Sequence, residues 1–157
     1  MASGGKQQKS PCNCTALRKA SRRVSQLYDS ALEPCGLRIT QRAILAQIAR
    51  SGAPPLGELA EALVMDRGAL THNLKPLERD GLVKISADPQ DRRNRLVVLT
   101  PAGTSKLEES ARLWKRAQDG FEAAFGTAKS AALREALAYV VSEDFAAAFN
   151  LRARDAS

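Results

Sequence analysis

The sequence contains a single histidine, His72, and none of the short motifs that mark common catalytic sites. It has no glycine-rich phosphate loop, no metal-binding His-x-x-x-His and no nucleophile motif. Catalysis needs several reactive side chains that converge on one substrate. We therefore expect that the protein is not an enzyme and that it has no cofactor and no metal site.

Long apolar runs are also missing, so the sequence predicts neither a signal peptide nor a membrane-spanning helix. The three cysteines are an odd number, which does not suit a closed disulfide framework. Both features favour a reduced, cytoplasmic protein. The 157 residues suffice for one hydrophobic core, so we expect one domain over residues 12–157 after a polar, disordered leader at 1–11.

Positive charge is unevenly distributed along the chain. Residues 1–100 contain 16 Lys and Arg against 9 Asp and Glu, whereas residues 101–157 contain 8 of each. The formal net charge of +7 therefore arises in the first 100 residues. A basic surface of this kind suits a protein that neutralises DNA phosphates, although an anionic membrane would attract it too.

Two amphipathic helices are predicted at the start of the chain. Apolar residues at helical spacing predict the first over residues 17–31. Thr40 is the expected N-cap of the second, with Ile39 placed before the cap to pack on Ile44. This second helix is expected to end near residues 51–52.

The segment from 56 to 81 predicts a helix-turn-helix. Two short helical patterns are separated by a turn at residues 64–65, and Asp66 is a strong N-cap for the second helix. Gly81 suits the C-terminal end of that helix. Two helices joined so tightly are typical of DNA-binding modules.

The second of these helices has two different faces. Leu70, Leu74 and Leu77 share an apolar face. The opposite face and its flanks carry Gly68, Ala69, Thr71, His72, Lys75 and Arg79. Such side chains can bond phosphates and base edges in a major groove. A merely solvated face is the alternative, but the preceding short helix and the following basic hairpin favour DNA.

Pro76 lies inside this helix and removes the backbone hydrogen bond to the His72 carbonyl, which costs about 3 kcal/mol in an ordinary helix interior. Either the helix bends here or packing of its three leucines holds it straight.

A β-hairpin is predicted after Gly81, because residues 82–86 and 95–100 are rich in β-branched residues and flank a polar segment. The charged tip carries Asp88, Asp91, Arg92, Arg93 and Arg95. An ion pair between Asp91 and Arg93 would fix the shape of this tip. The remaining arginines could enter a minor groove or bind phosphates.

Two long helices are predicted at the C-terminal end. Thr100 and Pro101 supply a cap and a first-turn proline for a helix that ends at Gly126, and Thr127 is the expected cap of the last helix. That helix carries an apolar stripe too long for a small monomer to cover, formed by Leu133, Leu137, Val140, Val141, Phe145 and Phe149. The terminal helices are therefore interpreted as a dimer interface.

The hairpin also carries a family signature. Asp91, Arg93, Leu99 and Thr100 match the pattern D-x-R-x-x-x-x-x-L-T, so the chain resembles the MarR family of bacterial transcriptional regulators over residues 14–149. The resemblance implies a mainly α fold with a small β-wing. In this fold a winged helix-turn-helix domain, about 37–100, is flanked by N- and C-terminal dimerisation helices at about 14–34 and 101–149. It also implies a homodimer that binds a pseudo-palindromic double-stranded DNA operator.

The resemblance further implies which residues contact DNA and which line an effector pocket. DNA contacts would come from Asp66, Arg67, Ala69, Thr71, His72, Asn73 and Lys75, with a wing contact from Arg93 or Arg95. Repression is the commoner mode of the family. A small, often aromatic or phenolic, anionic effector would release the DNA by favouring a recognition-helix spacing that no longer fits two half-sites. The candidates to line its pocket are Arg18, Arg22, Tyr28, Arg38 and Arg42.

Two alternatives stay open. Cys12 and Cys14 form a close thiol pair, and Cys35 or a partner subunit could add a ligand, so a redox-responsive or metal-responsive regulator is the competing function. A membrane-surface protein is disfavoured, because the basic helix at 17–31 carries only Tyr28 as an aromatic residue.

Overall fold

A computed structural model describes residues 11–155 of the chain. The expected leader at 1–11 therefore lies, except for Pro11, outside the described residues. The elements in chain order are α1 (Asn13–Leu32), the 3-10 turn η1 (Glu33–Cys35), α2 (Ile39–Ser51), α3 (Leu56–Ala62), α4 (Arg67–Arg79), β1 (Val83–Ala87), β2 (Arg95–Leu99), α5 (Pro101–Phe125), α6 (Thr127–Val140) and α7 (Glu143–Asp155). The prediction of a mainly α fold with a small β-wing is confirmed.

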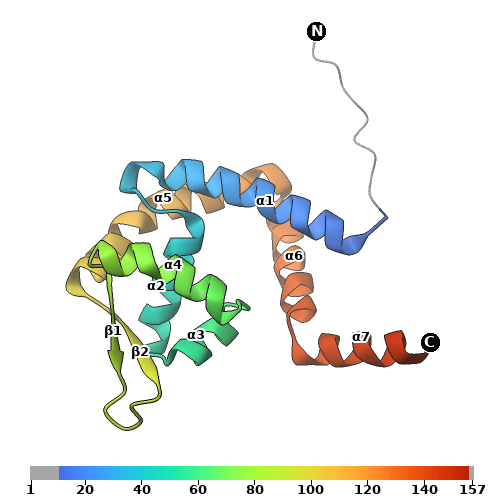
Figure 1. The fold of residues 1–157 in the computed structure, drawn as a ribbon. Helices are drawn as coiled ribbons and strands as arrows, with labels where there is room; N and C mark the ends of the chain where they lie inside the picture. The colour runs from blue at the N-terminus through green and yellow to red at the C-terminus, as the bar shows by residue number, and fades with distance from the viewer. Residues whose placement is uncertain (1–10, 156–157) are drawn as a thin grey trace.

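One hydrophobic core lies where α2, α3, α4 and the hairpin meet (Figure 1). The apolar face of α4 contributes Leu70, Leu74 and Leu77, each at most 1% exposed. Opposite them, Ile44 of α2 and Val97 of β2 are fully buried. Helix α4 continues through Pro76 to Arg79. Its buried leucines therefore hold the helix despite the missing hydrogen bond.

The turn between α3 and α4 is tight and closed by backbone hydrogen bonds. The amide of Met65 donates to the carbonyl of Ala60 at 2.9 Å, and Val64 adopts a positive φ of 52°. Asp66 caps α4, because its Oδ1 accepts a 2.7 Å hydrogen bond from the amide of Ala69. The predicted turn and its capping residue are confirmed, and α4 is held at a fixed angle to α3.

Strands β1 and β2 pair antiparallel from Val83 opposite Leu99 to Ala87 opposite Arg95. The loop before α3 adds to this sheet, because the amide of Val97 donates to the Pro54 carbonyl at 3.0 Å. The hairpin is thus tied to the helix-turn-helix at its root, while its tip projects from the molecule (Figure 1).

Helix α5 starts directly at the hairpin and runs beside α1. Thr100 caps α5 as predicted, with its Oγ1 accepting a hydrogen bond from the amide of Gly103 at 3.0 Å. Gly103 packs against the Leu82 carbonyl so closely that any Cβ would overlap this oxygen. Beyond α5, α6 and α7 extend away from the winged lobe (Figure 1).

Two predicted N-caps are wrong. Arg38, not Thr40, occupies the N-cap of α2: the Ile39 amide donates to Asp29 of α1 at 2.7 Å, and the Arg38 amide donates to Gln41 Oε1 at 2.9 Å. Gly126, not Thr127, precedes α6. Gly126 has a φ of 99°, a conformation that glycine adopts without steric strain, and α6 therefore follows α5 directly.

The predicted last helix is also two helices. The chain breaks after Val140, and Ser142 caps α7 by accepting a 3.2 Å hydrogen bond from the amide of Phe145. A serine followed by two acidic residues is a helix start, and it outweighs the apolar stripe that continues across the break.

Candidate nucleic-acid interface

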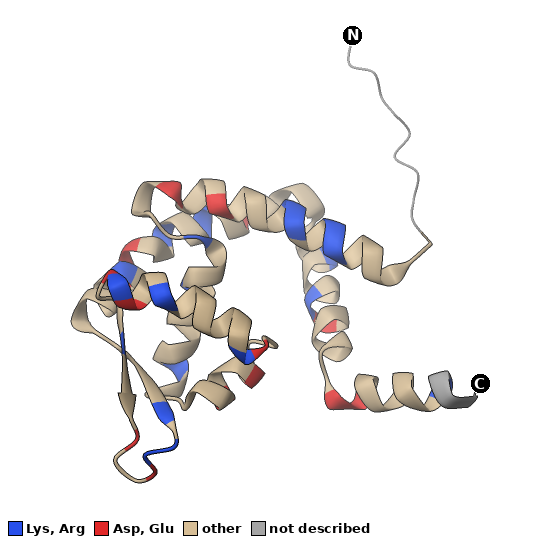
Figure 2. Cartoon of the chain, in the orientation of Figure 1, with Lys and Arg blue, Asp and Glu red and all other residues tan. Residues whose placement is uncertain are grey.

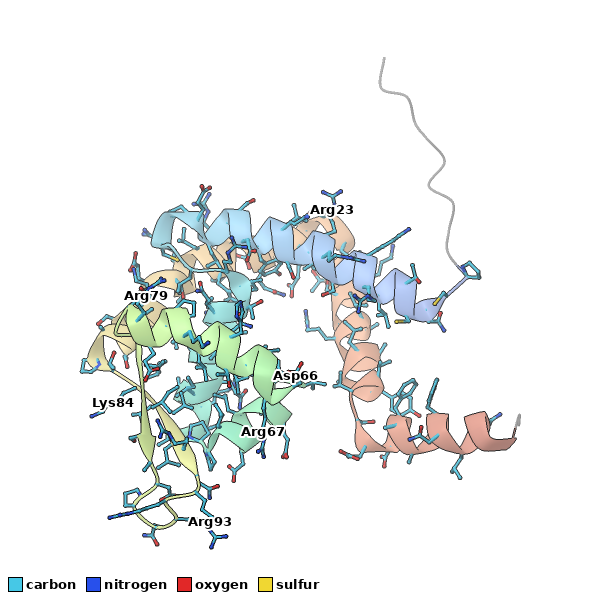
Figure 3. The ribbon with its side chains drawn as sticks, in the orientation of Figure 1. Arg23, Asp66, Arg67, Arg79, Lys84 and Arg93 are labelled. Atoms are coloured by element: carbon cyan, nitrogen blue, oxygen red, sulfur yellow. The ribbon has the colours of Figure 1, made fainter. Side chains whose placement is uncertain are left out.

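The exposed face of α4 carries most of the residues that the sequence proposed for DNA contact (Figure 3). Thr71, His72 and Lys75 are exposed, as is Arg67 at the start of the helix, while Asn73 is half-buried. Because the three leucines of α4 occupy the core, rotation of the helix cannot hide this face without unfolding the lobe. The fold therefore presents a row of hydrogen-bonding side chains to solvent.

Two of these side chains already donate to the backbone of their own helix. Thr71 Oγ1 donates to the Arg67 carbonyl at 2.7 Å, and Asn73 Nδ2 donates to the Ala69 carbonyl at 2.8 Å. Both bonds leave an oxygen acceptor, so in this conformation either residue can still accept from a base amine. Asp66 has a structural role as the N-cap, and DNA contact by its carboxylate stays a prediction.

The wing tip is shaped by two aspartates. Asp91 Oδ1 accepts a 3.1 Å hydrogen bond from the Arg93 amide and lies 3.9 Å from Arg93 Nε. Asp88 Oδ1 accepts from the Gln90 amide at 2.8 Å, a bond that the sequence did not suggest. The Arg93 side chain is 95% exposed, so its guanidinium remains accessible to DNA. An ion pair this exposed contributes at most about 1 kcal/mol to stability.

Further basic residues lie beside these two elements (Figure 2). Arg79 at the end of α4 bonds Asp80 at 2.9 Å, and this hydrogen bond raises the pKa of its guanidinium. Lys84 is exposed on β1, where sequence reasoning did not propose a contact. Successive side chains of a strand point to opposite faces, so the buried Val83 places Lys84 on the exposed face of the wing.

Within one chain, the five effector-pocket candidates do not lie together. Tyr28 and Arg42 both contact α5, since Tyr28 Oη donates to Gln118 at 2.9 Å and the Arg42 guanidinium lies 4.6 Å from the Trp114 ring centroid. These contacts are one helical turn apart on α5. The other three candidates lie elsewhere: Arg18 and Arg22 border a separate hollow on α1, and Arg38 is exposed at the start of α2.

Burial shifts the pKa of both residues that contact α5. It lowers the pKa of the Arg42 guanidinium and raises the pKa of the Tyr28 hydroxyl. Arg42 Nε also donates to Ser110 Oγ at 3.1 Å. A partly desolvated guanidinium on an aromatic ring is a suitable partner for an aromatic anion.

The cysteines occupy opposite ends of α1. Cys12 and Cys14 are exposed at its start, whereas Cys35 is buried after its end and its Sγ donates to the Leu32 carbonyl at 3.0 Å. A helix of 20 residues is about 30 Å long. Cys35 therefore cannot join the other two in one subunit, and that part of the sequence hypothesis is wrong. Within residues 11–155, no three His, Cys, Asp or Glu side chains are grouped to hold a metal ion.

Hydrogen bonds from the side chain and the backbone of Thr15 lower the pKa of the Cys12 thiol. The first turn of α1 therefore favours the thiolate form of Cys12. In the part of the chain that the structure describes, no helix is both long and apolar enough to cross a bilayer.

Comparison with known proteins gives one consistent result. The model of the MarR family matches residues 37–94, which contain α2, the helix-turn-helix and the start of the wing. The transcriptional activatory protein BadR of Rhodopseudomonas palustris is 37% identical over 93 residues, covering 57% of this chain and 53% of that protein. The multiple antibiotic resistance protein MarR of Salmonella typhimurium is 33% identical over 89 residues, covering 57% and 62%. The match thus spans little more than half the length of these curated relatives.

Solved structures match over a larger part of the chain. The Mycobacterium tuberculosis transcriptional regulator MosR in complex with DNA is 34% identical, with a TM-score of 0.69, and covers 82% of this chain and 97% of that one. The transcriptional repressor CouR bound to a 23-mer DNA duplex is 26% identical, with a TM-score of 0.76, and covers 83% and 93%. Both neighbours were solved with DNA.

Proposed function

Since the chain belongs to the MarR family of DNA-binding transcriptional regulators, we propose that it is a homodimeric repressor released from its operator by a small aromatic or phenolic anion. One subunit is proposed to form a single MarR-like domain. Its winged helix-turn-helix, about 37–100, lies between dimerisation helices at about 14–34 and 101–149.

The observation that carries this proposal is the pairing of an exposed polar α4 face with an exposed arginine on the wing. In the proposed complex, the first turns of α4 enter a major groove, where Thr71, His72 and Asn73 meet base edges and Lys75 meets a phosphate. Arg93 or Arg95 reaches the adjacent minor groove. The two aspartates bind backbone amides of the wing loop, and this loop presents the exposed guanidinium of Arg93.

Dimerisation is supported by apolar side chains that one chain leaves in water. Leu27 of α1 is 58% exposed, Val141 between α6 and α7 is 62% exposed, and Phe149 of α7 is 64% exposed. A second copy related by a two-fold axis would cover these surfaces and place two α4 helices on one face of DNA. Two half-sites one helical turn apart would then be read together.

The effector is proposed to bind between the winged lobe and α5, beside Arg42, Trp114 and Tyr28. The guanidinium would bind the carboxylate or phenolate, and Trp114 would stack on the aromatic ring. Because α2 carries Arg42 and α5 carries Trp114, an occupant would change the angle between the lobe and the dimer helices. Such a ligand shifts the population toward a spacing that no longer fits DNA.

The test is selection of bound fragments from a random duplex library near physiological salt, followed by measurement of specific and nonspecific affinities. We expect a pseudo-palindromic consensus whose binding weakens about tenfold in Thr71→Ala or Lys75→Ala. Lys115→Ala is the matched control, because Lys115 lies on α5 and pairs with Asp119. Failure to enrich any sequence, with only salt-dependent binding, would reject an operator-specific regulator.

Repression is tested in a second experiment, which measures transcription from the selected operator with and without the protein. A decrease in transcription is expected, whereas an increase would identify an activator.

A thiol-responsive regulator is the second candidate, favoured by the lowered pKa of Cys12 and the exposed Cys14 two residues away. In this version hydrogen peroxide converts the Cys12 thiolate to a sulfenate and is itself reduced to water. The sulfenate takes up a proton from water, and the Cys14 thiol then attacks the sulfur of the sulfenic acid, releases a second water and forms a disulfide. If operator affinity is the same before and after peroxide, and in a Cys12→Ser, Cys14→Ser variant, this version is wrong.

A further inference from the structure

A polar hollow lies between the start of α3, the start of α4 and the wing. Three guanidinium groups from separate elements border it, namely those of Arg67 on α4, Arg93 in the hairpin loop and Arg95 on β2. Figure 3 shows Arg67 beside α3 and Arg93 near the wing tip. The hollow therefore joins the two parts of the DNA-binding surface.

Gly57 of α3 forms the floor beneath Arg67. A Cβ built on Gly57 would lie 3.0 Å from Nη2, 3.7 Å from Cζ and 3.9 Å from Nε of Arg67. The three nearest atoms all belong to this one guanidinium group. The planar group thus lies across the bare backbone of α3, in space that the side chain of any other residue would occupy.

The guanidinium of Arg67 lies over Gly57 without the support of an ion pair from the described part of the chain. Among the described residues, Arg67 forms no salt bridge, although Glu58 and Glu61 also border the hollow. A side chain at position 57 would therefore displace the Arg67 guanidinium without breaking a salt bridge within the described residues. Its donors remain available to an external acceptor.

We propose that Gly57 is a positioning residue for DNA binding: its missing side chain places Arg67 where it binds, with the wing arginines, a backbone phosphate between the two grooves. This inference rests on the proposed function and names one contact of that interface. Guanidinium groups suit phosphate, because their planar N–H donors match its oxygens in pairs. The carboxylates of Glu58 and Glu61 repel an anion from the α3 side, which leaves the side between α4 and the wing.

The substitution Gly57→Ala separates this role from a role in folding. The closest contacts of the alanine methyl are with the flexible end of an exposed arginine, so the arginine, and not the backbone of α3, is expected to shift. Alanine also favours a helix more than glycine does. Thermal unfolding of the variant should thus occur at the wild-type temperature or above it.

The experiment measures fluorescence anisotropy of a labelled 25-base-pair mixed-sequence duplex at several NaCl concentrations. The proteins are the wild type, Gly57→Ala, Arg67→Ala and the double variant. We expect Arg67→Ala to weaken binding about fivefold to tenfold and to reduce the salt slope by about one. Gly57→Ala should weaken binding about threefold or more, yet add nothing in the Arg67→Ala background.

Lys115→Ala on α5 is the control, because Lys115 pairs with Asp119 and does not border the hollow, and it should bind as the wild type does. Size-exclusion chromatography checks that all variants keep the same oligomeric state. The proposal is overturned if Gly57→Ala binds normally, if it weakens binding equally with and without Arg67, or if it lowers the unfolding temperature. Failure of the wild type to bind any duplex would instead reject the proposed function, and this inference with it.

Discussion

Thr100 and Gly81 join the end of the recognition-helix segment to the start of α5. Thr100 Oγ1 donates a 2.6 Å hydrogen bond to the Gly81 carbonyl, and the Thr100 amide donates to the Leu82 carbonyl at 3.1 Å. Gly81 itself follows α4 with a φ of 71°. Thr100 therefore links the end of α4, the root of the wing and the start of α5.

Replacement of Thr100 by valine should destabilise the protein by about 2 kcal/mol. The variant loses the cap on the Gly103 amide and leaves the Gly81 carbonyl without its side-chain donor. Urea unfolding followed by circular dichroism measures the change. Thr127→Val is the control, because Thr127 is exposed and does not cap α6, and it should cost less than about 0.5 kcal/mol. Equal losses in both variants would contradict the proposed link.

Val64→Asn should stabilise the protein by about 1 kcal/mol, measured in the same assay. Val64 has a φ of 52°, a conformation that costs a β-branched residue about 1–2 kcal/mol and that asparagine tolerates. Because Val64 is 70% exposed, little apolar burial is lost. Val98→Asn, on the extended strand β2, should instead destabilise. A loss of stability in Val64→Asn would show that the strain at this turn is negligible.

Cys12 should react with iodoacetamide at lower pH than an ordinary cysteine does. The thiolate is the reactive form, and the bonds from Thr15 lower the Cys12 pKa, so the rate should rise with pH through a midpoint below that of the same chain unfolded in urea. Cys14→Ser and Cys35→Ser leave Cys12 as the only thiol. Adding Thr15→Val should move the midpoint upward. Identical midpoints in the folded and unfolded chains would rule out this effect.

Phe149→Glu should raise the dimer dissociation constant at least tenfold, as measured by sedimentation. A glutamate placed in an apolar interface must be buried without a partner. Val98→Glu is the matched control, since Val98 is exposed on the wing, and it should remain dimeric. If the wild type is monomeric at micromolar concentration, the proposed dimer itself is wrong.

The winged lobe could be predicted because its signals are local. Asp66, Gly81 and Thr100 each mark a helix end through their own side chain or backbone freedom, and the structure uses all three in this way. The exposed face of α4 followed from the spacing of three leucines. Local chemistry therefore fixed which side of α4 faces solvent.

The features that were missed depend on contacts between distant segments or on competing signals. Asp29 accepts a hydrogen bond from the first amide of α2, yet it lies ten residues upstream on another helix. The contact of Gly57 with Arg67 has no sequence signal, because it needs α3 and α4 at their folded angle. At Ser142 the cap signal was present, but the apolar periodicity across it favoured one continuous helix. The separation of Arg18 and Arg22 from Arg42 likewise follows from the path of α1 over α5.

Trp114 is the only tryptophan in the sequence, and it lies under the Arg42 guanidinium where α2 meets α5. The intrinsic fluorescence of the protein therefore comes from a single position at the joint between the winged lobe and the long helix. Any event that tilts the lobe must change the environment of this ring. The chain thus carries its own optical probe, and motion at this joint can be followed in real time without attaching a dye.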